Sequence, residues 1–170
     1  VDRCVWLVPC NADRVVRLNT SDLTMTAHRN WPAGFVHNQA NFKGGAIDAR
    51  GYIWLVPYAS PVVVSIEAAS GITTAYSNWP KGFTKTHANF VGGIYDGRGL
   101  WMVPHESPAV VRIDTISGNM QAYFSWPRVW WYSLGMFAGG CFDGSSVWMA
   151  PRDADALLEL GEEMPNVVVL

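Results

Sequence analysis

The chain has 170 residues, of which 49% are hydrophobic and only 15% are charged, and its formal net charge at pH 7 is −2. This length fits one domain, and the low charge content predicts that much of the chain is buried, either in its own core or against another subunit. No cluster of lysine and arginine is present, which argues against a nucleic-acid partner, and no apolar run approaches the roughly 20 residues of a membrane span. No signal peptide or lipidation motif is visible, which slightly favours the cytoplasm.

Three short phrases recur along the chain at a step of 47 or 48 residues. The first is an apolar run around a tryptophan (VWLVP, IWLVP, LWMVP and VWMAP), the second is a Trp-Pro pair, and the third is a Gly-Gly pair followed by an aspartate. Their anchor residues are Trp6, Trp54, Trp101 and Trp148; Trp31, Trp79 and Trp126; and Gly45, Gly93 and Gly140. A fixed period of this size predicts one supersecondary unit repeated within a single domain, with repeats at about 1–41, 42–89, 90–136 and 137–170.

One repeat, residues 92–127, has the composition of four short strands. The apolar segments GGIYD, LWMVP and AVVRID and the alternating segment NMQAYFSW are separated by the turn-forming segments DGRG, HESP and TISG. Strands joined by turns this short pair in antiparallel order. No segment of useful length has a helical period, so the chain is predicted to be all-β.

The four strands of a repeat, A to D in chain order, become more polar along the repeat. Strands A and B are apolar on both faces, as expected between neighbouring sheets, whereas strand D alternates like an outer edge. The Gly-Gly pair before strand A lets backbones crowd together where several sheets converge on one axis. These features predict a β-propeller of four-stranded antiparallel blades, with about four blades in the chain. The alternative is a β-trefoil, against which the fourth copy of the Trp-x-x-Pro pattern counts.

The phrase GGIYDGRGLWMVPHESPAVVRIDTISGNMQAY resembles a blade of the virginiamycin B lyase-like propellers and, more loosely, a kelch blade. The matching positions are Gly93, Asp96, Gly97, Leu100, Trp101, Val111, Arg112, Ile113, Asp114 and Gly118. The resemblance covers nearly the whole chain, and it implies the propeller fold. In the lyase family, catalysis is associated with a histidine and with acidic groups that hold magnesium near the centre. No position-by-position match to that site is found, so the resemblance transfers no catalytic residue.

The first and last blades are predicted to be partial. Residues 1–32 supply strands B, C and D of blade 1 without a strand A, and blade 4 begins at Phe137. The terminal segment NVVVL fits either strand D of blade 4 or the missing strand A of blade 1. The ring could therefore be a closed four-bladed monomer, a ring completed by a second copy, or a piece of a longer polypeptide. Exposed apolar blade flanks favour a homo-oligomer, a dimer that completes the propeller.

In propellers the B–C turns and the D–A links share one face, where ligands usually bind. The B–C turns place different side chains at equivalent positions, and variation within a constant frame is how a scaffold displays a site. The predicted ligand-binding residues are Tyr58, His105 and Arg152 in the turns, and His37, His87, Trp130, Trp131 and Tyr132 in the links. The three consecutive aromatic residues suit sugar stacking, a protein contact or burial in a subunit interface.

These residues predict a binding module for a small molecule, glycan or protein, more readily than an enzyme. No catalytic residue is assigned, although His105 and Glu106 are the best acid–base candidates. No metal ligand and no cofactor is assigned. The alternatives are a metal-dependent lyase or hydrolase that uses a divalent ion, and a module that serves only structural oligomerisation.

The remaining repeated residues are predicted to be structural. The recurring phenylalanines and tryptophans should pack between blades or clamp strand ends, and the recurring aspartates should form turns. The cysteines should be small buried residues without a disulfide. These residues are Phe42, Phe90 and Phe137; Asp48, Asp96 and Asp143; and Cys4, Cys10 and Cys141.

Overall fold

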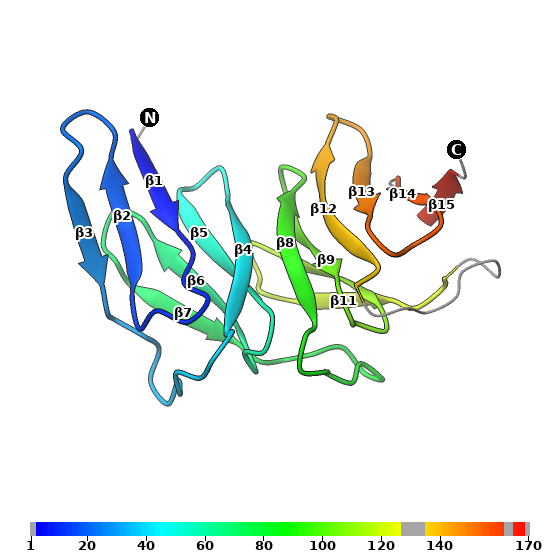
Figure 1. Ribbon diagram of the computed structural model, residues 1–170, viewed down its shortest axis with the longest axis horizontal. Helices are drawn as coiled ribbons and strands as arrows, with labels where there is room; N and C mark the ends of the chain where they lie inside the picture. Colours follow the sequence, from blue (N-terminus) through cyan, green and yellow to red (C-terminus); the bar gives the residue numbers. More distant parts are fainter. Residues whose placement is uncertain (1–2, 127–134, 162–164, 169–170) are drawn as a thin grey trace.

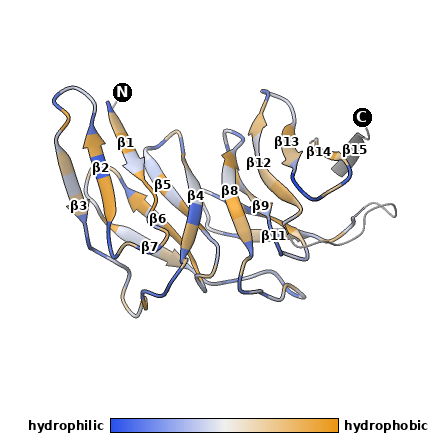
Figure 2. Ribbon diagram, in the orientation of Figure 1, coloured by the Kyte–Doolittle hydropathy of each residue, from blue (hydrophilic) through white to orange (hydrophobic). Residues whose placement is uncertain are grey.

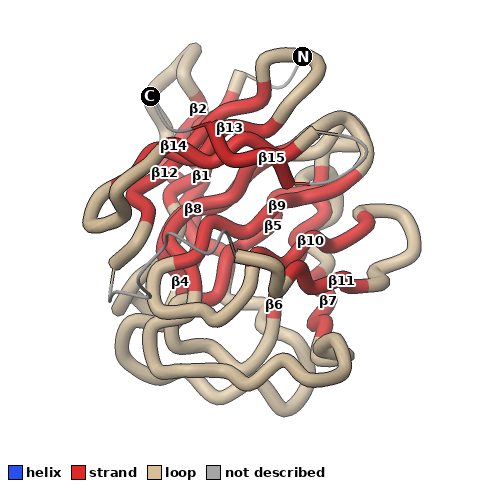
Figure 3. The backbone as a smooth tube through the Cα atoms, turned by 90° about the vertical axis from the view of Figure 1, so that its right-hand side faces the viewer, coloured by secondary structure: helices blue, strands red, loops and turns tan. Residues whose placement is uncertain are grey.

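The computed structural model describes residues 3–126, 135–161 and 165–168, and every regular element in these ranges is a β-strand (Figures 1 and 3). The strands form one three-stranded and three four-stranded antiparallel sheets, each in chain order. Blade 1 contains β1 (Cys4–Leu7), β2 (Val15–Asn19) and β3 (Met25–His28); blade 2 contains β4 (Phe42–Ile47), β5 (Tyr52–Pro57), β6 (Val63–Glu67) and β7 (Thr73–Tyr76); blade 3 contains β8 (Phe90–Tyr95), β9 (Gly99–Pro104), β10 (Val110–Asp114) and β11 (Met120–Tyr123); blade 4 contains β12 (Phe137–Phe142), β13 (Val147–Pro151), β14 (Leu157–Leu160) and β15 (Pro165–Val168).

The arrangement confirms the all-β prediction and the four antiparallel blades. Strands β4, β8 and β12 lie side by side as the inner strands of consecutive blades, and blade 1 lacks its inner strand (Figure 1). Strand β15 pairs with β14 as the outermost strand of blade 4, so the described part of the NVVVL segment, residues 166–168, serves blade 4 and not blade 1. Blades 1 and 4 lie at opposite ends of an arc, so the single chain does not close into a four-bladed ring (Figure 1). The four separate blades also show that the β-trefoil alternative is wrong.

The core lies between blades. One cluster joins blade 1 to blade 2, a second joins blade 2 to blade 3, and a third joins blade 3 to blade 4. Apolar residues accordingly concentrate in the strands, while the turns are more polar (Figure 2). The repeated phenylalanines Phe42, Phe90 and Phe137 are at most 1% exposed, as predicted for core residues.

The inner strands approach each other so closely that only glycine fits. A Cβ atom added to Gly44 would lie 2.7 Å from the Cα of Gly92 in the next blade, and Gly44 also has a φ of 81°. A Cβ added to Gly45 would lie 2.3 Å from the backbone oxygen of Trp54. Real side chains do not tolerate such distances, so Gly44 sets how tightly β4 and β8 of neighbouring blades converge, and Gly45 lets β4 approach β5 within its own blade.

The A–B turns repeat one hydrogen-bond pattern. The aspartate that ends strand A accepts backbone N–H groups of its own turn and the indole N–H of the repeated tryptophan. The indole-to-carboxylate distances are 3.1 Å for Trp54–Asp48, 2.7 Å for Trp101–Asp96 and 2.7 Å for Trp148–Asp143. The turn prediction for these aspartates is confirmed, and the tryptophan contact adds the partner that a buried indole needs.

The Trp-Pro tryptophans clamp the links between blades. Each indole N–H donates to a carbonyl oxygen in the B–C turn of the same blade: Trp31 to Asp13 at 2.8 Å, Trp79 to Pro61 at 2.9 Å and Trp126 to Pro108 at 2.7 Å. The Trp31 and Trp79 rings also stack on Phe42 and Phe90, the phenylalanines that begin the next inner strands. These contacts fix the D–A links against the B–C turns.

The prediction of buried cysteines without a disulfide is correct only in part. None of the three cysteines is in a disulfide, as expected, but Cys4 is half-buried and Cys10 and Cys141 are exposed. Cys10 lies in a B–C turn, and Cys141 faces outward from blade 4, which has no following blade to cover it. Within the described ranges no helix is found, and hence none long and apolar enough to cross a membrane.

Candidate ligand-binding face

The B–C turns and D–A links form one face of the molecule, called the loop face here (lower side in Figure 1). Its described parts are residues 8–14, 29–41, 58–62, 77–89, 105–109, 124–126, 135–136 and 152–156. The opposite side, called the hairpin face, carries the A–B and C–D turns. The shared position of turns and links is as the sequence predicted.

A backbone ladder runs across the loop face from blade to blade. A carbonyl in the B–C turn of one blade accepts the N–H of the residue that directly precedes the inner strand of the next blade. The carbonyl of that residue accepts, in turn, an N–H from the B–C turn of its own blade. The donor–acceptor pairs are Asn41–Cys10 (3.0 Å), Tyr58–Asn41 (2.9 Å), Asn89–Tyr58 (2.8 Å), His105–Asn89 (2.9 Å), Met136–His105 (3.2 Å) and Arg152–Met136 (2.9 Å). Main-chain bonds of this kind place the side chains of the turns irrespective of what those side chains are.

Three of the predicted ligand residues meet on this ladder. The edge of the Tyr58 ring packs on His105, with ring centroids 5.4 Å apart and planes at 62°. Atom Nε2 of His105 lies 3.4 Å from a guanidinium nitrogen of Arg152. At the other end of the row, Lys43 Nζ lies 5.0 Å from the centre of the Tyr58 ring, in cation–π contact. The result is a row of Lys43, Tyr58, His105 and Arg152 across blades 2, 3 and 4.

His105 is neutral at pH 7. Burial first, and then the nearby positive charge of Lys43, hold its pKa below the usual 6.5. A guanidinium group can only donate, so Nε2 of His105 accepts from Arg152 and the ring proton sits on Nδ1. Nδ1 is buried and has no hydrogen-bond partner. The row therefore holds an N–H donor whose hydrogen bond is unmade.

A second unpaired polar atom lies on the same ladder. Oδ1 of Asn41 is buried without a partner, although its Nδ2 donates to the carbonyl of Asn38 at 2.6 Å. An unmade hydrogen bond in a buried site costs about 1–3 kcal/mol. Both atoms are buried, so a water or ligand group would have to enter between the loops to recover that cost.

The acidic groups near the row are paired. Glu106 is 9% exposed and lies 3.4 Å from His87, and Asp153 lies 3.7 Å from Arg152. Lys43 contacts no carboxylate among the described residues. The free positive charge of the row is therefore greatest at the Lys43 end.

The other sequence predictions stand apart from the row. Nε2–H of His37 donates to the carbonyl of Ala12 at 2.6 Å, beside the Trp31 ring in blade 1. His87 is largely exposed and touches the site only through Glu106. Residues Trp130, Trp131 and Tyr132 lie outside the described residues.

Lys43 was missed by the sequence argument. It occupies a strand position next to the repeated Gly-Gly pair, where the other repeats have Val91 and Ala138. A signal was available, because Lys43 is a charged residue at an otherwise apolar repeat position. Charge within an apolar register is the kind of exception that indicates a site.

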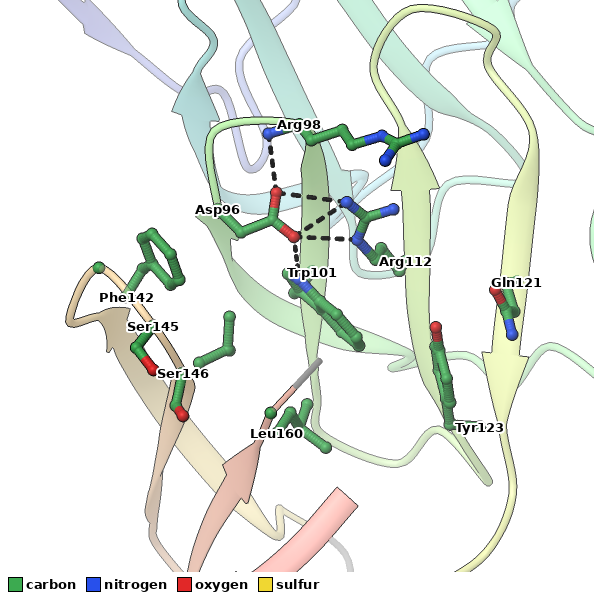
Figure 4. Close-up of a pocket in the computed structure, with 13 residues that line it drawn as sticks. Asp96, Arg98, Trp101, Arg112, Gln121, Tyr123, Phe142, Ser145, Ser146 and Leu160 are labelled. Carbon is green, nitrogen blue, oxygen red and sulfur yellow. Dashed lines mark hydrogen bonds and ion pairs between the residues drawn. The ribbon is translucent and has the colours of Figure 1, made fainter. Parts of the chain in front are cut away.

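The hairpin face holds a cavity of about 1060 Å³ between blades 3 and 4 (Figure 4). Its lining includes Asp96 and Arg112, which form an ion pair at 3.0 Å, together with Tyr123 and Ser145. In the preceding gap the equivalent space is filled, since Tyr76 packs against Gly118, where an added Cβ would lie 2.6 Å from the ring. In blade 4 Pro165 pairs with Leu160, as Met120 pairs with Ile113 in blade 3, so the register of this hairpin departs from the period of 47 residues. The cavity is thus the place where the repeat pattern stops.

The lyase resemblance implies a magnesium ion near the axis. The described residues contain no group of three or more His, Cys, Asp or Glu side chains that could hold a metal ion. Glu106 pairs with His87, and Asp153 pairs with Arg152, so the nearby acids are directed to other partners. The residues described here do not fit that ion.

Comparison with known proteins supports the assignment of the fold. No protein family and no curated protein matches the sequence. Similar solved structures include the catalytically inactive virginiamycin B lyase of Staphylococcus aureus with quinupristin (TM-score 0.72, 15% identity, 99% of this chain and 53% of that chain). They also include a streptogramin B lyase (TM-score 0.72, 13% identity, 98% and 51%) and dihydro-heme d1 dehydrogenase NirN (TM-score 0.68, 14% identity, 99% and 35%). The chain spans about half the length of the two lyases. Together with the four radiating sheets, these similarities show that the chain has the fold of a β-propeller.

Proposed function

We propose that this chain is a binding module whose loop face takes a small anionic ligand. The observation that carries the proposal is the row of Lys43, Tyr58, His105 and Arg152, in which a buried His105 N–H has no partner. Two exposed cations at the ends of the row attract an anion. The N–H of His105 and the Tyr58 ring add one directed hydrogen bond and an apolar surface, which together orient a ligand.

A sugar acid matches this combination of groups. Its carboxylate pairs with Arg152 or Lys43, its hydroxyl groups accept from His105, and its ring face packs on Tyr58. A protein or a larger glycan that carries such a group would use the same contacts. Ligand binding would remove the cost of the unmade hydrogen bonds at the ladder.

The test compares galacturonate with galactose, which differ in the carboxylate. We expect chemical-shift changes and a raised melting temperature with galacturonate at millimolar concentration, and weaker or no effect with galactose. Arg152→Ala and Lys43→Ala should each weaken galacturonate binding about tenfold. Arg98→Ala, which removes an exposed cation from the hairpin face, is the matched control. Equal binding of both sugars, or unchanged binding in both loop-face variants, would contradict the proposal.

A lyase or hydrolase that uses His105 and Glu106 as acid and base is the second candidate function. One observation favours it: His87, His105 and Glu106 all lie on the loop face of blade 3, and His87 contacts Glu106. Quinupristin is a suitable probe, because one similar lyase was crystallised with it. Turnover of quinupristin that Glu106→Gln abolishes would support this function, whereas purified protein without turnover would count against it.

A further inference from the structure

The interface between blades has two unlike halves, and each internal blade supplies both. The half that faces the following blade is called the trailing stripe; in blade 2 it comprises Trp54, Val56 and Val63. The half that faces the preceding blade is called the leading stripe; in blade 2 it comprises Phe42, Ile53, Leu55, Val64 and Ile66. The same pairing of trailing with leading stripe occurs between blades 1 and 2, 2 and 3, and 3 and 4.

The leading stripe of blade 1 is uncovered. Val5 and Leu7 are each 46% exposed, whereas the equivalent Ile53 and Leu55 of blade 2 are 4% and 0% exposed. The other two members of this stripe, Val16 and Leu18, are half-buried. Blade 1 thus presents to solvent the surface that blades 2, 3 and 4 bury.

The trailing stripe of blade 4 is uncovered in the same way. Ala150 is exposed, whereas the equivalent Val56 and Val103 are 0% exposed. Trp148 is half-buried, in contrast to Trp54 at 1%. Cys141 is exposed on this flank, at the position that Ile94 occupies in blade 3 with 6% exposure.

We infer that a second copy of this chain covers both flanks, with blade 1 of each copy packed on blade 4 of the other. The partner is identified by continuity, because the chain already makes this contact three times and carries one spare half at each end. A two-fold axis then forms the contact twice and closes the ring, whereas an unclosed head-to-tail contact would grow into a filament. The chain spans 53% of the virginiamycin B lyase, so two copies supply as much chain as one such protein.

The flanks have the character of a permanent interface. Both are apolar β-surfaces of the kind that soluble proteins keep covered, since uncovered sheets of this type aggregate. Each buried contact within the chain joins unlike stripes, so a contact of two leading stripes or two trailing stripes has no precedent in the molecule. The proposed dimer therefore has a defined geometry, in which each leading stripe packs on a trailing stripe.

Sedimentation and light scattering of the full chain test the inference. We expect a dimer, twice the chain mass of 18.8 kDa, at micromolar concentration. Leu7→Glu and Ala150→Glu each place a carboxylate in both copies of the contact and should raise the dimer dissociation constant at least about 100-fold. Ile116→Glu, at a 76% exposed apolar residue of a C–D turn, is the matched control and should leave the dimer intact. Circular dichroism of each variant checks that it folds.

Mixing the two variants tests the head-to-tail geometry. A mixed pair of Leu7→Glu and Ala150→Glu chains can form one unaltered contact, so heterodimers should appear where neither variant dimerises alone. If only one of the two substitutions disrupted the dimer, the contact would join like stripes and the proposed geometry would be wrong. Filaments in place of dimers would also overturn the closed ring.

Thiol labelling of the unaltered chain gives an independent readout. Cys141 lies on the trailing flank and Cys10 on the loop face, and both are exposed in the single chain. In the ring, Cys141 should react with maleimide at least about tenfold more slowly than Cys10, because it is covered as Ile94 is. A folded chain that stays monomeric at 100 µM (about the upper range for a specific interface), with Cys141 as reactive as Cys10, would overturn the inference. The flanks would then belong to another partner, such as further blades of a longer polypeptide.

Discussion

The two faces of the molecule are built on the same repeat but use it differently. On the hairpin face, Asp48, Asp96 and Asp143 accept the same hydrogen bond from the repeated tryptophan in blades 2, 3 and 4. On the loop face, a repeated backbone ladder places Tyr58 and His105, among other side chains that differ between blades. Repetition of a side chain therefore indicates structure, and variation on a repeated backbone indicates a site. The following predictions test that contrast.

The largest effect is expected from breaking the framework at the axis. Gly44→Ala adds a Cβ 2.7 Å from the Cα of Gly92 and forces a residue with a side chain to a φ of 81°. We expect a loss of about 3–5 kcal/mol in the free energy of unfolding, measured by chemical denaturation. Gly139→Ala is the matched control, because it lies at the same repeat position and has nothing within 4 Å. In a Leu7→Glu background, where the chain should be monomeric, Gly139→Ala should lower the free energy of unfolding much less than Gly44→Ala does. Similar losses of unfolding free energy in Gly44→Ala and Gly139→Ala would contradict the close approach of β4 to β8.

Removal of one repeated aspartate should have the next largest effect. Asp96→Ala leaves the Trp101 indole and the backbone N–H of Gly99 without their acceptor and frees Arg112 from its ion pair. We expect a loss of about 2–3 kcal/mol by thermal or chemical denaturation. Asp143→Ala, in the end blade, removes the same pattern from a more exposed turn and should cost less. Neither variant should change ligand binding at the loop face.

Acid should destabilise the protein through these carboxylates. Burial alone would raise the pKa of Asp96, but N–H groups of Gly99 and Arg98, the Trp101 indole and Arg112 together hold it below the ordinary 3.8. A lowered pKa contributes stability that is complete above the unfolded value and is lost as pH falls through the folded value. The free energy of unfolding should therefore fall below about pH 4, and Asp96→Asn should flatten this fall. An unchanged acid profile in Asp96→Asn would show that other groups set it.

The smallest effect is expected from the variable position. His105→Phe keeps a ring against Tyr58 and removes the titrating group and its unpaired N–H. Because the His105 pKa lies below 6.5, the unaltered protein loses stability as pH falls below 6.5, and the variant should lose less, by under about 1 kcal/mol. Stability at pH 7.5 should stay the same or rise, because the unpaired N–H is removed, whereas galacturonate binding should weaken. A large loss of stability at pH 7.5 would place His105 in the framework.

Much of the loop face could be predicted from the sequence, and the reason is its period. Tyr58, His105 and Arg152 were found because they break a repeat at equivalent turn positions, and the structure brings these three together. His37 was also chosen by residue type, but its offset from the repeat differs, and the structure leaves it in blade 1 beside Trp31. Lys43 was not predicted, because its neighbours on β4 are repeated structural residues.

The period of 47 or 48 residues was sufficient by itself to determine the blades, their antiparallel strands and the residues that pack between them. Such features depend on local pattern and on contacts that recur, so each copy reinforces the others. Only the tertiary structure decided that NVVVL completes blade 4, that His105 keeps an unpaired N–H, and that the arc ends in two unlike apolar flanks. These facts depend on which segments meet across long distances in the chain, and a repeated sequence fits several such pairings equally well.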